Sequence, residues 1–117
     1  MHNFKQLSVW EKAMSMAQAV HELCHLLPDS ERYGLISQMR RAAVSVPSNI
    51  AEGSGRGSNA DFRRFLSIAI GSAYELETQL LLTGCFGYCT DEQVGPIVTQ
   101  LSELQRMLYG LRNSLRD

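Results

Sequence analysis

The chain has 117 residues, of which 44% are hydrophobic and 20% charged, and its formal net charge is −1. A chain of this length buries about two thirds of the surface that it would expose when unfolded, which is enough for one hydrophobic core. The near-neutral charge excludes bulk electrostatic attraction as a reason to expect a nucleic-acid or membrane partner. We therefore expect one domain that spans residues 1–117.

The three cysteines and the short apolar runs indicate the cellular compartment. Cys24, Cys85 and Cys89 are an odd set, and the first six residues contain no basic stretch followed by an apolar region. Such a pattern is typical of a reduced protein without a secretion signal. No apolar run reaches the length of a membrane span. We expect a cytoplasmic protein with no disulfide framework.

Residues 8–27 predict the first helix. Ser8 and Glu11 match a capping box, in which each side chain accepts a hydrogen bond from the other residue's backbone N–H. Pro28 and Asp29 are expected to end the helix. Apolar residues at intervals of three or four predict one buried face: Val9, Ala13, Met16, Val20, Cys24 and Leu27.

A second helix is expected to begin near residues 31–33 and to end in the glycine-rich stretch 53–57. Pro47 lies inside it and removes the hydrogen bond to the carbonyl of Ala43. The apolar spacing stays in phase across Pro47, so the sequence predicts one continuous helix with a kink there. Its predicted core residues are Leu35, Met39, Ala42, Val46 and Ile50.

A third helix is expected to start at Ser58 or Asn59 and to end at Gly84 and Gly87. Both starting residues are good N-caps, and Asp61 in the first turn suits the helix dipole. Its predicted core residues are Phe62, Phe65, Leu66, Ala69, Ala73, Leu76, Leu80 and Thr83.

Thr90 is the expected N-cap of a fourth helix, with Gln93 three residues later. Gly95 and Pro96 disturb this start, so one alternative is that the regular helix begins only at Pro96. The predicted core residues are Val94, Ile97, Leu101, Leu104, either Met107 or Leu108, Leu111 and Leu115. With short connections throughout, the sequence predicts an all-α, up-down antiparallel four-helix bundle.

Several apolar residues fall outside these core positions. One interpretation is that they form contacts between subunits; the other is that each helix of the bundle packs against two neighbours. They are Leu7, Trp10, Leu26, Ile68, Ile70, Leu81, Leu82 and Phe86.

The segment from His21 to His25 reads H-E-x-x-H. On a helix, two histidines one turn apart can chelate zinc while Glu22 acts as a general base, which makes a metal-dependent hydrolase one alternative function. Catalytic zinc needs a third protein ligand, and the only other histidine is His2. We predict no metal site, no cofactor and no catalytic residues.

The glycine-rich stretch 53–57 allows two interpretations. A turn that leads into a helix N-terminus can bind an anion through its free N–H groups, here assisted by Arg56. Alternatively, the glycines supply the positive φ angles of a chain reversal. We favour the second interpretation, because the segment lacks the residues of a P-loop.

Arginines are concentrated in one part of the sequence. Residues 32–64 contain six arginines and two acids, a net charge of +4, whereas residues 65–105 contain five acids and no base. One hypothesis is that the basic region contacts phosphates; the other is that its arginines pair with acids within or between subunits. The candidate nucleic-acid-binding residues are Arg40, Arg41, Arg56, Arg63 and Arg64.

Blocks of sequence along nearly the whole chain resemble a known family. They include Tyr33-Gly-Leu, Ser37-Gln-Met-Arg-Arg-Ala-Ala43, Val46-Pro-Ser-Asn-Ile-Ala-Glu-Gly53, Glu75-Leu-Glu-Thr-Gln-Leu80 and Gly87-Tyr88. In this order they resemble the proteins related to those encoded by intervening sequences inside bacterial 23S ribosomal RNA genes. The chain is also similar to the accessory proteins of diversity-generating retroelements, which are more basic.

The resemblance implies a four-helix bundle that assembles into a ring, typically a homopentamer. The retroelement proteins bind nucleic acid together with a reverse transcriptase, which makes RNA or a ribonucleoprotein a candidate partner. From this we expect a non-enzymatic, ring-forming binding or scaffold protein that contacts RNA through its arginines. A module that binds only other proteins is the remaining alternative.

Overall fold

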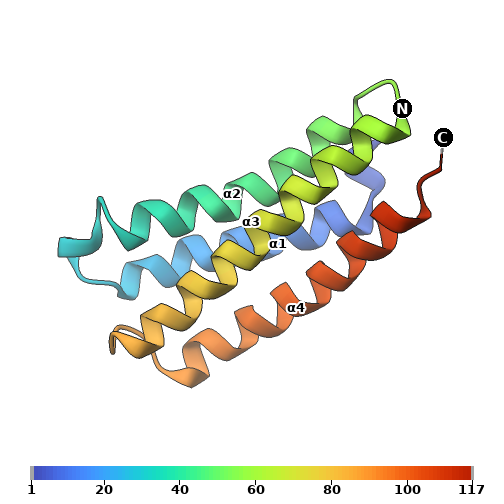
Figure 1. Cartoon of the computed structure of the whole chain (residues 1–117). Helices are drawn as coiled ribbons and strands as arrows, with labels where there is room; N and C mark the ends of the chain where they lie inside the picture. Colours follow the sequence, from blue (N-terminus) through green and yellow to red (C-terminus); the bar gives the residue numbers. More distant parts are fainter. Residues whose placement is uncertain (1, 117) are drawn as a thin grey trace.

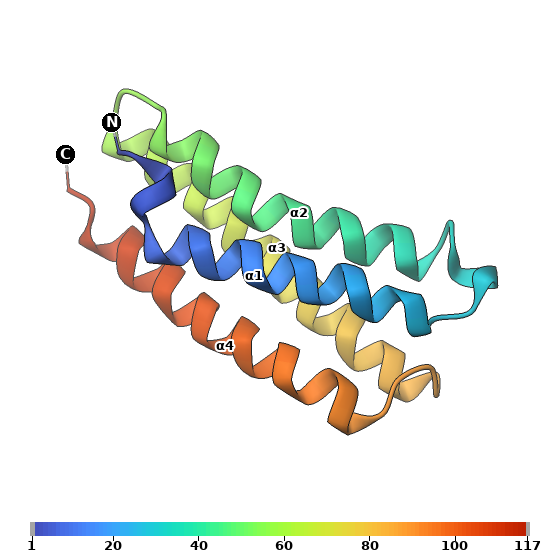
Figure 2. The same cartoon turned by 180° about the vertical axis from the view of Figure 1, so that it is seen from behind.

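The computed structural model describes residues 2–116 and consists of four long antiparallel helices (Figures 1 and 2). They are α1 (Ser8–Leu23), α2 (Leu35–Ser54), α3 (Asn59–Cys85) and α4 (Asp91–Ser114). Three short 3-10 helices, Phe4–Gln6, Cys24–Leu26 and Asp29–Glu31, lie before and after α1. No strand occurs between residues 2 and 116. The predicted all-α, up-down four-helix bundle is confirmed.

Each helix packs against two neighbours. Helix α1 contacts α2 and α4, and α3 contacts the same two helices from the opposite side. The backbones of the diagonal pairs, α1 with α3 and α2 with α4, lie farther apart than those of neighbouring helices. The two chain ends lie at the same end of the bundle (Figure 2).

The core lies along the axis between the four helices. The predicted core positions of the first three helices are all buried, and so are those of α4 except Met107 and Leu111, which are half-buried. Apolar burial of this kind is the main force that holds a bundle together. Its largest fully buried side chains are Met16, Met39, Ile50, Phe62, Leu66, Leu76, Leu80, Leu101, Leu104 and Leu108.

The start of α1 differs from the prediction. Leu7 is the N-cap and makes no side-chain cap, so Ser8 is already the first helical residue and the predicted capping box with Glu11 is wrong. The backbone carbonyl of Leu7 accepts from the N–H groups of Trp10 and Glu11 at 3.1 and 3.2 Å. The 3-10 helix that precedes α1 is capped by Asn3, and α1 begins one residue earlier than the capping-box motif predicts.

Helix α2 starts at Leu35, later than predicted. The 3-10 helix at residues 29–31 precedes it, and a carboxylate oxygen of Glu31 accepts a hydrogen bond from the N–H of Leu35 at 3.1 Å. The helix then runs through Pro47 to Ser54. The predicted continuity through Pro47 is confirmed, whereas a kink there stays a prediction.

The glycines of residues 53–57 do not act as predicted. None of Gly53, Gly55 and Gly57 has a positive φ; among the described glycines only Gly87, after α3, does, at 78°. Gly53 instead allows close packing: a Cβ there would lie 2.7 Å from the Cβ of Phe65. The predicted chain reversal is confirmed, since α2 ends at Ser54 and α3 starts at Asn59, but the predicted positive φ angles are wrong.

Helices α3 and α4 have the predicted N-caps. Ser58 accepts from the N–H of Asp61 at 3.1 Å, and Thr90 forms a complete capping box with Gln93. The alternative that α4 begins only at Pro96 is wrong, because α4 starts at Asp91 and continues through Pro96. Proline removes one hydrogen-bond donor, and the capped first turn compensates for that loss.

Glu31 also links the start of α2 to the loop between α3 and α4, since the hydroxyl of Tyr88 donates to its carboxylate at 2.9 Å. The N–H of Leu35 and the Tyr88 hydroxyl together lower the pKa of Glu31 below its ordinary value. A lowered folded-state pKa stabilises the fold at neutral pH, and this stabilisation is lost as the pH falls through that pKa.

We therefore expect Tyr88→Phe to raise the pKa of Glu31 toward its ordinary value. The variant should be less stable than the wild type at about pH 7 and should lose this deficit at a pH below the lowered pKa of Glu31, where the carboxyl is protonated in both proteins. An NMR titration of the Glu31 carboxyl and unfolding curves at both pH values measure the two effects. An unchanged Glu31 pKa would contradict the role of the hydroxyl.

Candidate functional site

Five arginines gather around two neighbouring hollows at one end of the bundle. The two chain ends lie at this same end (Figure 2). They come from the turn after α2, the first turns of α3, and the end of α4 with the residues that follow it. We call them the terminal arginine cluster: Arg56, Arg63, Arg64, Arg112 and Arg116.

A hollow of 490 Å³ between the start of α3 and the end of α4 is the centre of this cluster. Four of the five arginines line it, together with Ser67 and Asn113. Side chains from both helices thus converge on one concavity that offers many N–H donors.

A second hollow of 400 Å³ lies beside the first. His2, Arg56, residues 57–59 and Phe62 line it, and Arg116 lines both hollows. The N-terminus of α3, capped by Ser58, is part of this surface. The positive end of a helix dipole therefore adds to the charge of the arginines.

Hydrogen bonds to neighbouring groups hold the arginines in place. The Nη1 of Arg63 donates to the carbonyl of Leu115 at 3.2 Å, and that of Arg112 donates to the hydroxyl of Ser67 at 3.2 Å. Arg116 donates to the carbonyl of Asn113 at 2.8 Å, and its own carbonyl accepts from Asn59. Because a guanidinium has five N–H donors, Arg112 and Arg116 keep donors for a ligand.

The described acids closest to Arg56 and Arg64 neutralise these two arginines only weakly. Glu52 lies 3.8 Å from Arg56 and Asp61 lies 3.8 Å from Arg64, and all four side chains are exposed by about half. Exposed ion pairs of this length contribute little. No carboxylate from residues 2–116 lines either hollow.

The guanidinium groups of Arg56 and Arg64 lie over the ring of Phe65, at 4.8 and 4.6 Å from its centroid. Phe65 itself is buried. Cation–π contact fixes both arginines on the same ring. The ring is covered by them, so it is not open to a stacking base.

The two remaining candidate arginines lie outside the cluster. Arg40 is half-buried and donates to the carbonyl of His21 at 3.2 Å, rather than to the carboxylate of Glu22. Arg41 is on the exposed side of α2. The structure therefore brings together Arg56, Arg63 and Arg64 and separates Arg40 and Arg41 from them.

Sequence reasoning missed Arg112 and Arg116. They are far from the other arginines in the chain, and a count of charge along the sequence does not connect them. The signal was nevertheless present, because an up-down bundle places the end of its fourth helix beside the start of its third.

The H-E-x-x-H segment finds no third ligand among residues 2–116. Helix α1 ends at Leu23, so His25 lies in the following 3-10 helix, and the ring centroids of His21 and His25 are 5.9 Å apart on the surface. Within the described part of the chain, no three His, Cys, Asp or Glu side chains are grouped to hold a metal ion. The residues present thus do not form the three-ligand arrangement of catalytic zinc.

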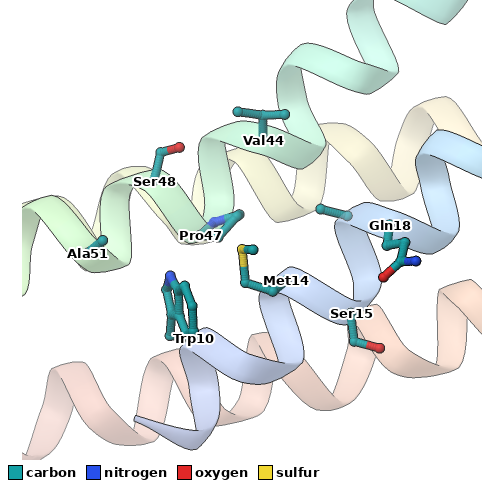
Figure 3. A pocket seen from close by; sticks show the side chains of 9 residues that line it. Trp10, Met14, Ser15, Gln18, Val44, Pro47, Ser48 and Ala51 are labelled. Atoms are coloured by element: carbon teal, nitrogen blue, oxygen red, sulfur yellow. The ribbon is translucent and has the colours of Figure 1, made fainter. Parts of the chain in front are cut away.

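A groove of 750 Å³ between α1 and α2 is a second surface feature, which we call the α1–α2 groove (Figure 3). Trp10 and Met14 of α1 point toward Pro47 of α2 within it. None of its lining residues is charged: Trp10, Met14, Ser15, Ala17, Gln18, Val44, Pro47, Ser48 and Ala51.

No helix between residues 2 and 116 combines the length and the apolar character that crossing a membrane requires. The helices are amphipathic, and their apolar faces are used within the bundle.

Comparison with known proteins identifies the family. A family model described as 23S rRNA-intervening sequence protein matches residues 5–110. The crystal structure of a protein of unknown function from the S23 ribosomal protein family of Bacteroides thetaiotaomicron VPI-5482 is 28% identical, with a TM-score of 0.84, over 91% of this chain and 96% of that one. No curated protein matches the chain. Since the family model spans most of its length, the chain belongs to the 23S rRNA-intervening sequence protein family.

Proposed function

We propose that this protein is a non-enzymatic, self-assembling binding protein that contacts RNA phosphates through the terminal arginine cluster. The observation that carries the proposal is the hollow between α3 and α4, which four arginines line and no described carboxylate enters. The family's name, which refers to intervening sequences of 23S rRNA, supports RNA as the ligand.

Arginine suits this role because its planar guanidinium donates two parallel hydrogen bonds to a phosphate. Contacts of this kind position a protein on a nucleic acid without reading its sequence. The ring of Phe65 is covered by Arg56 and Arg64. We therefore propose recognition of the RNA backbone rather than stacking on single-stranded bases.

Self-assembly strengthens weak contacts. A chain with a net charge of −1 has little long-range attraction for RNA, and one cluster offers only a few phosphate contacts. Several copies in one assembly present several clusters to the same RNA, and linked sites bind more tightly than separate ones.

The proposal predicts salt-sensitive RNA binding that depends on two arginines of α4 and its C-terminal extension. We expect Arg112→Gln with Arg116→Gln to weaken binding of a fluorescently labelled RNA hairpin. The slope of log affinity against log salt should become shallower by about 0.9 for each phosphate that the variant no longer neutralises. Fluorescence anisotropy at several salt concentrations measures both quantities.

Arg106→Gln is the matched control. Arg106 is an exposed arginine of α4 that donates to Ser102 and lines neither hollow. Its replacement should leave the salt slope unchanged. If the wild type does not bind the hairpin in low salt, or if Arg106→Gln weakens binding as much as the double variant, RNA contact through this cluster is wrong. The first of these results would favour a protein-only partner.

A further inference from the structure

We infer that a third hollow, which we call the Arg40 hollow, binds a phosphoryl group, either as free phosphate or as the end of a phosphate monoester. The hollow has a volume of 280 Å³ and lies between the residues that follow α1 and the first two turns of α2. This connection is at the opposite end of the bundle from the two chain ends and the terminal arginine cluster (Figure 2). A site here is therefore independent of the RNA contact and of self-assembly.

A buried donor of Arg40 has no partner in the described part of the chain. The Nη2 of Arg40 donates to the carbonyl of His21 at 3.2 Å, whereas its buried Nε finds no hydrogen-bond acceptor among residues 2–116. Buried N–H groups of folded proteins nearly always have a partner, which is a protein group, an ordered water or a bound ion. Because Arg40 lines the hollow, an oxyanion bound there can supply the acceptor.

No carboxylate of residues 2–116 forms an ion pair with Arg40. Cys24 lies beside Arg40 and also lines the hollow. Burial raises the pKa of the Cys24 thiol above its ordinary value, and the guanidinium of Arg40 lowers it by less. The thiol therefore stays protonated at neutral pH and gives Arg40 no negative charge. A half-buried cation without a counter-charge favours an anionic ligand, because buried charges are stable when they are paired.

Two further side chains bring donors to the Arg40 hollow. Arg32 lines it and pairs at 2.9 Å with Asp29, which lines it as well. Both partners of this pair are mostly exposed, so the pair contributes little, and Arg32 keeps N–H groups for a ligand. His25, which follows α1, can donate from its ring. With two arginines against one aspartate, the hollow has a net positive charge.

The size and the walls of the hollow suit a small oxyanion. Pockets that enclose larger organic ligands have volumes of about 300–1,000 Å³, and this hollow is smaller. Leu27 is buried and Ile36 is half-buried, so part of the wall is apolar, and charges interact more strongly beside such a wall than in water. A phosphoryl group has several acceptor oxygens, and a guanidinium donates two parallel hydrogen bonds to it.

A ligand in the Arg40 hollow joins two segments of the chain. Arg40 belongs to α2, whereas His25 belongs to the 3-10 helix that follows α1. A ligand that binds only the folded chain stabilises it, and the stabilisation grows with the ligand concentration. Phosphate should therefore raise the midpoint of thermal unfolding above the value measured in chloride at the same ionic strength.

The NMR signal of the Arg40 Nε–H group reports on this hollow directly. Phosphate is titrated at constant ionic strength into the full chain that carries Arg112→Gln and Arg116→Gln, which weakens the terminal arginine cluster as a competing phosphate site. We expect the Arg40 signal to shift until it saturates, as for a single site. The Nε–H signal of Arg41 should stay in place, because Arg41 is exposed and does not line the hollow. An Arg40 signal that does not move in millimolar phosphate would overturn the inference.

Arginine variants in the same background measure the contribution of each donor. Arg40→Gln should weaken phosphate binding at least about tenfold, the size expected for the loss of one charge-assisted hydrogen bond. Arg32→Gln changes an exposed side chain, so it should fold normally and also weaken binding. Arg41→Gln is the matched control and should bind as its parent does. The inference is wrong if Arg41→Gln weakens binding as much as Arg40→Gln or, should Arg40→Gln not fold, as much as Arg32→Gln.

Adenosine monophosphate distinguishes the two sources of the phosphoryl group. If it shifts the Arg40 signal at lower concentrations than phosphate does, the ligand is the phosphoryl end of a larger molecule. If phosphate acts at lower concentrations, the ligand is the free ion. A shift with neither compound would refute the site and leave the RNA contact untouched, because that contact is decided by Arg112→Gln with Arg116→Gln on the labelled hairpin.

Discussion

Replacing Leu76 by alanine is expected to lower the free energy of unfolding by about 2–5 kcal/mol. Leu76 has no exposed surface and lies in the middle of α3, where the helix packs against α2 and α4. The substitution removes buried methyl groups and leaves a cavity that surrounding side chains fill only in part. Urea unfolding followed by circular dichroism measures the decrease.

Leu81→Ala is the control for this prediction, because it makes the same chemical change on the same helix at a side chain that is 53% exposed. Its cost should stay within about 0.5 kcal/mol. Both variants and the wild type have to be compared at one protein concentration, since the proposed self-assembly would add to the apparent stability. Equal destabilisation at Leu76 and Leu81 would contradict the position of the core.

The helices and their buried faces could be predicted from the sequence because the apolar residues repeat with the period of a helix. In α3, for example, Phe62, Leu66, Ala69, Ala73 and Leu76 are spaced by three or four, and all are buried. Only one face of a helix at this period can be turned away from water. The pattern therefore specifies both the element and its orientation in the bundle.

Helix ends were harder to predict because they depend on the structure of the residues that precede and follow each helix. Ser8 has the sequence of an N-cap but lies inside α1, since the preceding 3-10 helix begins the turn earlier. Pro96 has the sequence of a helix start but lies inside α4, since the capping box at Thr90 already fixes the first turn. In both cases a neighbouring element outweighed a local motif.

Only part of the candidate site could be predicted, because charge along a sequence is not charge in space. Arg63 and Arg64 are neighbours in the chain and are both predicted, whereas Arg112 and Arg116 reach the same hollow from α4. The sequence groups Arg40 with them, but its guanidinium donates to a carbonyl of α1. The antiparallel arrangement of α3 and α4 determines which arginines act together.

Replacing Gly53 by alanine is expected to destabilise the fold by about 1–3 kcal/mol. A Cβ at this position would lie 2.7 Å from the Cβ of Phe65 and 2.9 Å from a ring carbon of Phe62. The Cβ of Phe65 is fixed to its backbone, so α2 and α3 would have to move apart. Without this contact the sign would be reversed, because alanine is favoured over glycine inside a helix by about 1 kcal/mol.

Gly57→Ala is the matched control for the Gly53 substitution. Gly57 lies only a few residues later, and its Cβ would have open space within 4 Å. Thermal unfolding should show a lower midpoint for Gly53→Ala and almost no change for Gly57→Ala. A Gly53→Ala protein more stable than the wild type would mean that α2 and α3 can separate without cost. Because the ring of Phe65 supports Arg56 and Arg64, the same displacement should also weaken the RNA contact that we propose for these arginines. Close packing at one glycine thereby connects the stability of the bundle to the placement of its arginines.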